Sequence, residues 1–453
     1  MAVTAGEPTK SSEVTGLGEA IIRYIDTQEA LEEFISKSEG AEILAIDTEF
    51  LRERTYYPQL CLIQLATEKH EVIIDPFAPL DFTPLIALLT DERVTKIFHA
   101  GDQDRAILYQ SFGVVVRPVF DTQHAVLLLG LPQQLSLIAL VKHFCGISLS
   151  KGESFSDWSQ RPLARAQLSY AVEDVRFLPE IHQKIVSELT EKGRLSWLEG
   201  DFRAMEDEEK YRFDEKTIWR KLKGAASLKG SQLAVIQDLA IWREAAARKR
   251  NIPRKWILPD ELLVEIARRE PRSTDALFST RGLKEKLGAT WSREVLAIVK
   301  AARERPSSEW PTMERPPAKD ASITTRLHLM NAVTHQRSRE LHIASSFLAA
   351  HDELVRLAAG QRDDLMILQG WRRELLGDEL LELLAGRLSL SLVDEGLKVV
   401  RVAAAVEGAE AAAPAPPAEA AEIAAPPAEA TPAGTAEAAK VTLLSQAKIS
   451  PSQ

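Results

Sequence analysis

The sequence predicts a mixed α/β domain followed by all-α domains, and three observations indicate this. Short apolar runs that end at charged residues or proline, which are typical of strands, fill the first quarter of the chain. From Asp121 onward, apolar residues recur at helical spacing instead. The 453 residues are too many for one ordinary domain and suggest two to four. We therefore expect a mixed sheet packed between helices, with helical domains after it.

The elements of the sheet domain follow in chain order. A helix around residues 29–35 is expected to start at Asp26, because Asp is a preferred N-cap. The three strands after this helix are consecutive and short, so we expect them to form a meander. We expect strands at 43–50, 60–66, 71–76, 94–98 and 114–120. We expect helices at 84–89, 102–112, 122–129, 135–144, 163–177 and 179–189.

A basic helical region follows. Residues 215–305 hold 21 Lys and Arg against 11 Asp and Glu, although the whole chain has a net charge of -10. We expect its helices at 232–249, 260–269, 274–278, 284–286 and 292–303. Residues 306–320 contain four prolines, which predicts a linker. Residues 321–402 are expected to be helical again. The chain beyond Val406 is rich in Ala, Pro and Glu and is expected to be disordered.

Cysteine usage and hydropathy predict a cytoplasmic protein. The two cysteines, Cys61 and Cys145, lie in apolar contexts, which is typical of buried thiols in a reducing compartment and argues against a zinc site. The polar residues 1–18 lack the apolar run of a signal peptide, and no stretch approaches the length of a membrane span. We therefore expect no membrane association.

Acidic residues in three separate segments form the candidate catalytic group. Asp47 and Glu49 end an apolar strand, where residues i and i+2 point to the same face. Asp104 follows His99-Ala100-Gly101 at the start of a helix that Asp102 is expected to cap. Tyr170 and Asp174 are spaced i, i+4 and share one helix face. Each segment alone is explained by a solvated strand end, a helix cap or packing, but the combination is more specific. A divalent cation would neutralise such clustered carboxylates.

These segments resemble the exonuclease motifs of the DEDD superfamily, in its tyrosine-containing, ribonuclease D-like branch. The same resemblance extends to the stretches around Tyr56-Tyr57-Pro58, Phe120-Asp121-Thr122-Gln123 and Asp157-Trp158, and so covers about residues 20–200. The basic region resembles an HRDC domain at Leu239-Ala240-Ile241-Trp242-Arg243 and Pro259-Asp260-Glu261-Leu262-Leu263. Residues 326–400 are similar to the more diverged second helical domain of the family, notably at Gly370-Trp371-Arg372-Arg373.

The resemblance implies an RNase H-like fold and a metal-dependent 3'-5' exoribonuclease that releases 5'-mononucleotides. It implies two divalent cations, Mg²⁺ or Mn²⁺, held by Asp47, Glu49, Asp104 and Asp174, and a Tyr170 that orients or helps deprotonate the attacking water. The implied substrate is RNA with a free 3' end, such as a tRNA precursor. No feature of the sequence points to an obligate protein partner.

With the resemblance, the chain divides into six parts. They are a flexible leader (1–18), the exonuclease domain (19–205), an HRDC domain (215–305), the proline-rich linker (306–320), a second, diverged HRDC-like domain (321–405) and a disordered tail (406–453).

Several polar residues are weaker candidates. Asp121 could be a fifth acid near the cleft, but a cap on the helix at 122–129 is the favoured interpretation. His99 and His124 are expected to be hydrogen-bonded or packed rather than to act as bases. Lys151, in the aperiodic loop 149–158, could contact phosphate, although a solvated lysine explains it equally well. A basic patch that could bind the RNA backbone comprises Arg248, Lys249, Arg250, Arg254 and Lys255.

Two other functions stay open from the sequence. The same catalytic motifs serve DNA exonucleases, so the sugar of the substrate is not fixed. Alternatively, the chain could be a catalytically inactive RNA-binding protein that uses its basic helical region as a tether. The intact acidic motifs argue against this second alternative.

Overall fold

The structure is a computed structural model, and it describes residues 13–15, 21–149, 156–212, 214–215, 217–313, 320–393 and 396–402. The predicted tail, most of the leader, and Lys151 with most of its loop therefore lie outside the described residues. Among the described residues, no helix combines the length and the apolar character that crossing a bilayer requires.

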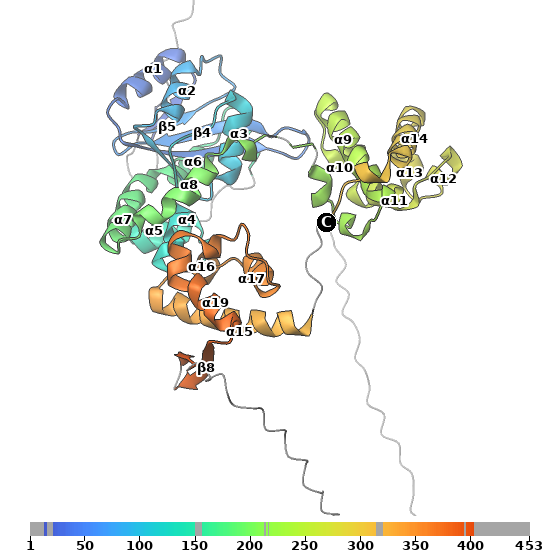
Figure 1. Ribbon diagram of the computed structural model, residues 1–453. Coiled ribbons are helices and arrows are strands. Elements are labelled where there is room, and N and C mark those ends of the chain that lie inside the picture. The colour runs from blue at the N-terminus through green and yellow to red at the C-terminus, as the bar shows by residue number, and fades with distance from the viewer. Residues whose placement is uncertain are drawn as a thin grey trace, which may run out of the picture. The chain divides into compact units, whose positions relative to one another are not determined.

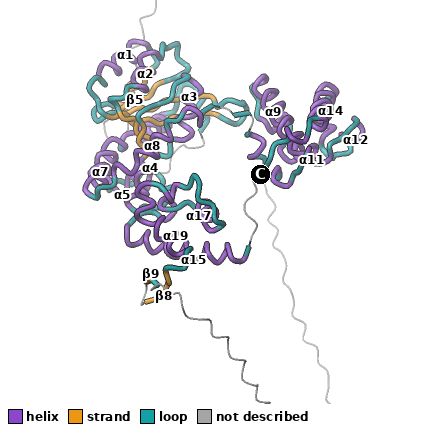
Figure 2. Tube along the Cα trace, in the orientation of Figure 1, coloured by secondary structure: helices purple, strands orange, loops and turns teal. Residues whose placement is uncertain are grey.

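The first domain is built on a seven-stranded mixed sheet with the order β1-β2-β5-β4-β3-β6-β7 (Figure 1; orange in Figure 2). The strands β3, β4 and β5 are antiparallel neighbours, as the predicted meander requires. The pairs β2/β5, β3/β6 and β6/β7 are parallel, so the sheet is mixed. The bounds are β1 Glu13–Thr15, β2 Ile21–Ile25, β3 Ile43–Leu51, β4 Gln59–Ala66, β5 Glu71–Ile74, β6 Thr95–Phe98 and β7 Val119–Asp121.

Helices cover both faces of this sheet, because the side chains of its central strands are apolar on both faces. On one face, α1 (Gln28–Lys37), α2 (Thr83–Thr90) and α3 (Asp102–Phe112) bury leucine, isoleucine and phenylalanine side chains against Leu44 and Ile46 of β3. On the other face, α6 (Arg165–Arg176) packs on β3, β4 and β5, and α7 (Leu178–Glu191) packs beside it on β3 and β6. The residues at the carboxyl end of β3 therefore lie beneath α6.

Four details of this domain differ from the sequence prediction. The N-cap of α1 is Thr27, whose side chain accepts a hydrogen bond from the Ala30 amide, and not Asp26. The edge strand β2 was not predicted, and β1 lies inside the predicted leader and pairs with β2. The predicted strand at 114–120 is shorter, because only β7 pairs with the sheet. Asp102 does not cap α3, since Gly101 holds the N-cap position and the Asp102 carboxylate pairs with Arg105 instead.

Among the remaining helices of the first domain, those at 122–129 and 137–145 agree with the prediction to within a few residues, whereas the two between residues 195 and 205 were not predicted. They surround the apolar side chains that α7 and the end of the sheet leave uncovered. Their bounds are α4 Thr122–Ala125, η1 Val126–Leu129, α5 Leu137–Cys145, η2 Leu195–Leu198 and α8 Glu199–Met205.

The basic region forms a helical domain around its own apolar core. Trp219, Leu239 and Ile257 are fully buried in this core, and the long helix α9 packs against α11 and α14. All five predicted helices are present, with ends that differ by at most three residues, and a further short helix at 254–257 was not predicted. The bounds are α9 Ser231–Arg250, α10 Arg254–Ile257, α11 Asp260–Arg269, α12 Thr274–Phe278, α13 Leu283–Lys286 and α14 Ala289–Glu304.

The third region is helical only in part. The structure places an antiparallel hairpin, β8 (Leu388–Val393) and β9 (Gly396–Arg401), where the sequence prediction was helix to residue 402. The physical reason is the strict alternation of Leu and Ser over residues 388–392, which has the period of a strand and not of a helix. The helices before it are α15 Ala321–Leu341, α16 Ser345–Leu348, α17 His351–Ala358, α18 Gly370–Arg372 and α19 Asp378–Leu384.

Candidate active site

Asp47 and Glu49 lie at the carboxyl half of the central strand β3. The first residues of β3, from Ile43 to Ile46, are buried and fix the strand in the core. A register shift follows Glu49, where β3 pairs irregularly with β4. Since residues i and i+2 of a strand share a face, both carboxylates lie on one face of the sheet, as the sequence predicts, and this is the face that α6 covers.

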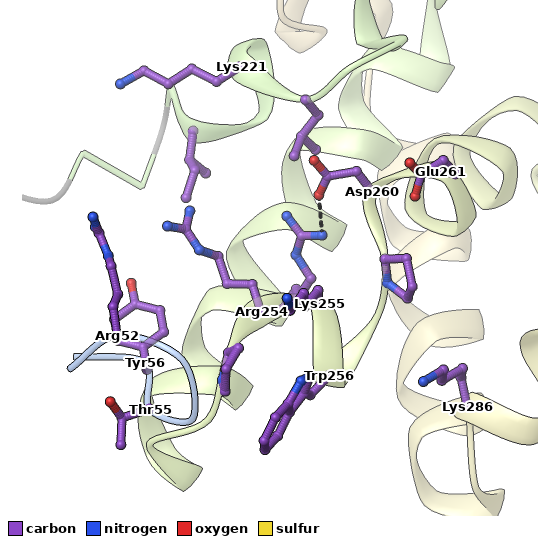
Figure 3. A pocket seen from close by; sticks show the side chains of 15 residues that line it. Arg52, Thr55, Tyr56, Lys221, Arg254, Lys255, Trp256, Asp260, Glu261 and Lys286 are labelled. Atoms are coloured by element: carbon purple, nitrogen blue, oxygen red, sulfur yellow. Dashed lines mark hydrogen bonds and ion pairs between the residues drawn. The ribbon is translucent and has the colours of Figure 1, made fainter. Parts of the chain in front are cut away.

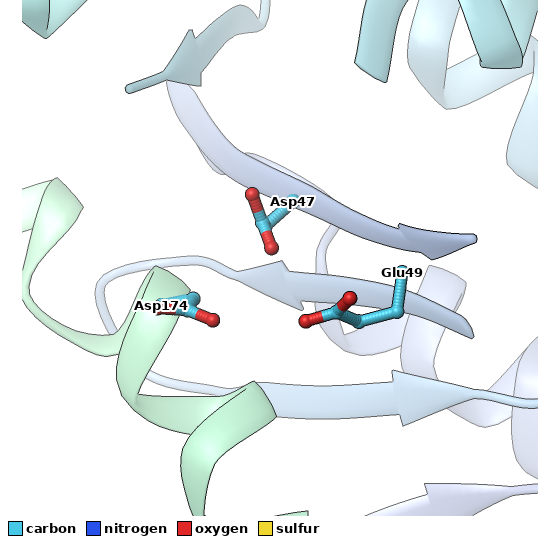
Figure 4. A group of neighbouring side chains, drawn as sticks. All are labelled: Asp47, Glu49 and Asp174. Atoms are coloured by element: carbon cyan, nitrogen blue, oxygen red, sulfur yellow. The ribbon is translucent and has the colours of Figure 1, made fainter. Parts of the chain in front are cut away.

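The helix α6 brings a third carboxylate to the same place. Its buried face is formed by Leu168, Ala171, Val172 and Val175, and this face presses α6 onto the sheet. Oxygen atoms of Asp47, Glu49 and Asp174 lie within 4.8 Å of one another. Figure 4 shows these carboxylates turned toward a common space between the strand and the helix. The Tyr170 hydroxyl donates a hydrogen bond to the Asp174 carboxylate, one turn further along α6.

Asp104 borders this group but does not belong to the closest trio. It lies in the first turn of α3 and is buried, and its Oδ1 accepts a hydrogen bond of 2.5 Å from the Thr48 hydroxyl. The turn before α3 requires glycine, because a Cβ at Gly101 would lie 2.5 Å from the Cβ of Phe98. The structure thus brings together three of the four predicted acids and holds the fourth beside them through Thr48.

Burial and mutual repulsion both raise the carboxyl pKa values. Burial, and then the charges of Asp104, Asp174 and Glu49, hold the pKa of Asp47 well above its usual range. Burial and the charges of Asp174 and Asp104 raise the pKa of Glu49 to about 8. Burial raises the pKa of Asp174 to about 7, with Glu173 and Asp104 adding to it. The acidic group therefore binds protons at neutral pH unless a cation replaces them.

The donor set fits a hard divalent cation. Carboxylate oxygens are the ligands that Mg²⁺ and Mn²⁺ prefer, and the three converging side chains offer six such oxygens. A cation would relieve the repulsion that raises the pKa values, so its binding is expected to release protons. The arrangement can therefore hold metal next to a phosphate and next to the phenol of Tyr170.

The repulsion among the acids gives a testable stability effect. The folded protein binds the Glu49 proton at a pKa of about 8, whereas an unfolded glutamate has a pKa of about 4.3. The stability from this proton is present below about pH 4.3 and is lost as the pH rises through 8. We expect the melting temperature of Glu49→Gln, in EDTA at pH 8, to exceed that of the wild type by about 2–4 °C or more. In a domain of this size, a change of 1 kcal/mol in the free energy of unfolding shifts the melting temperature by about that amount.

Thermal unfolding in EDTA at pH 5 and at pH 8 measures this effect, and the gap between variant and wild type should shrink at pH 5. The matched control is Glu39→Gln, an exposed glutamate after α1, which should behave as the wild type at both values of pH. A Glu49→Gln variant that melts at or below the wild type at pH 8 would contradict the expectation.

Asp121 has a role that the sequence prediction did not assign to it. It caps α4 as predicted, by accepting a hydrogen bond from the Gln123 amide. Its two carboxylate oxygens also accept hydrogen bonds from the amides of Ala100 and Gly101. Asp121 therefore fixes the turn that positions α3 and Asp104. Its place directly after the predicted strand at 114–120 was the available sequence signal.

As predicted, the two histidines are hydrogen-bonded or packed: His99 is hydrogen-bonded and His124 is packed. His99 contacts the Thr122 hydroxyl and the Leu135 carbonyl through its two ring nitrogens, both at 2.9 Å. His124 lies 3.6 Å from the Asp201 carboxylate and packs edge-on against Phe347. Neither ring belongs to the carboxylate group described above.

Arg161 anchors the segment that precedes α6, and the sequence prediction missed this role. Its guanidinium makes two hydrogen bonds to the Asp75 carboxylate, of 2.6 and 2.8 Å, and donates to the carbonyls of Cys61 and Trp158. Trp158 is buried in turn, with its ring centroid 6.1 Å from that of Tyr170. Arg161 therefore fixes the position of Trp158, whose ring neighbours that of Tyr170.

Comparison with known proteins identifies the family. Residues 22–190 match the 3'-5' exonuclease family, and residues 232–299 match the HRDC domain. Ribonuclease D of Sphingobium indicum is 37% identical over 390 residues, which cover 83% of this chain and 98% of that protein. The chain belongs to the ribonuclease D family. Ribonuclease D of Gluconacetobacter diazotrophicus is 36% identical over 382 residues, with coverage of 84% and 96%.

A solved structure of the ribonuclease D family agrees with this assignment. The crystal structure of Escherichia coli RNase D, an exoribonuclease involved in structured RNA processing, matches with a TM-score of 0.71 and 30% identity over 81% of this chain and 99% of that one. The predicted α/β exonuclease domain followed by helical HRDC-type structure is confirmed. The chain is a 3'-5' exoribonuclease of the ribonuclease D family.

In the basic patch predicted in the HRDC domain, the arginines contact neighbouring side chains, whereas the lysines are exposed. Arg248 pairs with Glu215 and donates to the Tyr56 hydroxyl, and Arg254 pairs with the buried Glu244. Arg250 lies over the ring of Trp291, 4.8 Å from its centroid. Lys249 and Lys255 are exposed, and no carboxylate in the described part of the chain is within ion-pair distance of them.

A pocket of about 880 Å³ adjoins Lys255 (Figure 3). Its wall includes Arg52 and Tyr56 from the segment between β3 and β4, and Trp256, which is 48% exposed, from the HRDC domain. Tyr56 is held there by a 2.6 Å hydrogen bond from its hydroxyl to Glu244. The sequence prediction did not include Arg52 or Trp256 among the candidate RNA contacts.

Proposed function

We propose that this ribonuclease D family member uses two divalent cations, Mg²⁺ or Mn²⁺, to release 5'-mononucleotides from RNA 3' ends. Asp47, Glu49, Asp104 and Asp174 are the proposed ligands. The observation that carries the proposal is the convergence of three partly buried carboxylates beside a tyrosine. Asp47 is the best candidate to bridge two ions, because the charges of all three other acids act on it.

The bound cations would supply the charge that activates a water and stabilises the leaving oxygen. Asp47 and Glu49, on the rigid strand β3, would hold the cations together with Asp174 of α6, and the cations would bind the scissile phosphate. Asp104 would bind a cation through one carboxylate oxygen, because the Thr48 hydroxyl is hydrogen-bonded to the other. The pairing of Thr48 with Asp104 keeps that carboxylate oriented before substrate binds.

Tyr170 is the proposed catalytic group for the attacking water. Burial, and then the charges of Asp174, Glu49 and Asp47, raise the pKa of its phenol above the usual range, so it carries its proton at neutral pH. A protonated phenol orients a water by hydrogen bonding and does not act as a free base. The charge of bound cations would lower this pKa and so increase the fraction of phenolate, the form that can accept a proton from the water.

The proposed substrates are structured RNAs with a free 3' end, and tRNA precursors in particular. The attached HRDC domain, with its regional excess of positive charge, supports a substrate larger than a short oligonucleotide. The test uses a 3'-labelled tRNA precursor and a matched DNA strand, each with Mg²⁺, with Mn²⁺ and with EDTA. Removal of the RNA trailer one nucleotide at a time, only with cation, is expected. Equal digestion of the DNA strand would instead favour a DNA exonuclease.

The exposed lysines of the HRDC domain are proposed to contact the RNA backbone. Arg248, Arg250 and Arg254 would contribute less, because each is already held by a neighbouring side chain. Lys151 stays a proposed contact outside the described residues. Both cysteines are free, which supports a reducing compartment such as the cytoplasm.

Salt dependence of binding tests the proposed role of the lysines. We expect the Lys249→Gln, Lys255→Gln double variant to bind single-stranded RNA more weakly than the wild type. The slope of the logarithm of its association constant against the logarithm of the salt concentration should become less steep by about 0.7 for each phosphate that is no longer neutralised. Fluorescence anisotropy between about 50 and 200 mM salt, a range over which affinity changes steeply, measures both effects. The matched control is Lys192→Gln, an exposed lysine outside the basic region. Equal slopes for the double variant and the wild type would remove the proposed role.

A further inference from the structure

A buried glutamine beside Asp47 has no partner for its side chain. Gln64, in the middle of β4, is fully buried, and neither its Nε2 nor its Oε1 has a hydrogen-bond partner in the structure. Among the described residues, no other side chain has two buried polar atoms without a partner. Leaving a buried polar group unpaired costs about 1–3 kcal/mol. Such a residue in the interior requires an explanation other than packing.

The register of the sheet places Gln64 next to the catalytic group. Gln64 is the direct cross-strand partner of Asp47 in the antiparallel β3/β4 pair, and Ile73 of β5 is its partner on the other side. Residues directly opposite each other in such a pair have Cβ atoms about 4.5–5.5 Å apart and point to the same face. The carboxamide therefore lies beside the Asp47 carboxylate.

On this face of the sheet, apolar side chains surround Gln64 on the side away from Asp47. The neighbouring Leu62 and Ile73 belong to an apolar cluster that α6 closes with Leu168, Ala171 and Val172. In an apolar cluster of this kind, a leucine or methionine would serve packing better than an amide. Of the two cross-strand partners of Gln64, only Asp47 is polar, so this carboxylate is the group that best explains the carboxamide.

We propose that Gln64 is a positioning residue for Asp47: its Nε2 donates a hydrogen bond to the Asp47 carboxylate, directly or through one water, when that carboxylate holds a cation. Asp47 has two oxygens, and a donor on one of them fixes the direction in which the other points to the ion. Groups that orient a metal ligand in this way typically change metal affinity or activity by about 10–100-fold when removed. The inference rests on the proposed cation site at Asp47, Glu49 and Asp174.

The test is the variant Gln64→Met, which keeps nearly the same shape and length but cannot hydrogen-bond. Its affinity for Mn²⁺ alone, measured by calorimetry without RNA, is expected to fall by about 10–100-fold. Its melting temperature in EDTA is expected to equal or exceed that of the wild type, because an unpaired buried amide has been removed. The matched control is Leu65→Met, the next residue of β4, which points to the opposite face of the sheet.

Unchanged Mn²⁺ affinity in a folded Gln64→Met protein would overturn the inference and leave the cation site intact. A wild type that binds no Mn²⁺ would overturn both. A measurement on the wild type covers the case in which the variant does not fold: the side-chain amide resonance of Gln64, in protein labelled with ¹⁵N-glutamine, should shift on addition of Mg²⁺. A resonance that does not respond to Mg²⁺ would also overturn the role of Gln64.

Discussion

Asp47→Asn is expected to lower the rate of nucleotide release from RNA by about 10³-fold or more, since loss of charge stabilisation worth several kcal/mol translates into such a factor. The Asp47 carboxylate is largely withdrawn from solvent and lies within 4.8 Å of those of Glu49 and Asp174. The amide keeps the shape of the side chain but loses the negative charge and one acceptor oxygen. The variant should fold, because it removes a source of repulsion.

The measurement is the release of mononucleotides from a 3'-labelled RNA in Mg²⁺ and in Mn²⁺, with melting temperature as the check on folding. The matched control is Asp102→Asn, an aspartate in the same first turn of α3 whose side chain is 92% exposed. The control should retain activity within a few-fold of the wild type. An Asp47→Asn enzyme that digests RNA as fast as the control would rule out the proposed cation site.

Tyr170→Phe is expected to slow the reaction by about 10²–10⁴-fold, the usual contribution of a positioned proton-transfer group. The phenol hydroxyl is bonded to Asp174, and the ring is held against Trp158, so phenylalanine should occupy the same place without the hydroxyl. We expect cation affinity to change little, because the carboxylates remain. This combination separates Tyr170 from the ligands, whose loss should affect affinity and rate together.

The rate of single turnover as a function of pH, together with Mn²⁺ affinity by calorimetry, checks this prediction. The wild-type rate should rise with pH, because deprotonation of the water or phenol helps the attack. That rise should weaken in Tyr170→Phe. Tyr109→Phe is the matched control, since its hydroxyl bonds to Glu208 on the outside of α3. A Tyr170→Phe variant with wild-type rates at every pH would mean that the phenol has no catalytic part.

Local patterns explain why most of the fold could be predicted. Apolar runs with proline or charge at their ends indicated the central strands, and helical spacing indicated α3, α11 and α12 with nearly the bounds that the structure has. The edge strand β2 was missed although four of the five residues of Ile21–Ile25 favour strands, because the segment is short and its pairing with β5 is a long-range event. The β8–β9 hairpin was missed although its Leu/Ser alternation was visible, because the surrounding chain is helical.

The sequence by itself determined the kind of chemistry, through the acids and the tyrosine at their spacings. Only the tertiary structure decided how close the acids come: α6 packs Asp174 against Asp47 and Glu49, while Thr48 holds Asp104 slightly apart. It also decided that Gln64 lies unpaired beside Asp47 and that the basic patch is partly occupied by its own neighbours. The physical reason is that spacing along a chain fixes which face a side chain takes, whereas sheet register and helix packing fix which faces meet.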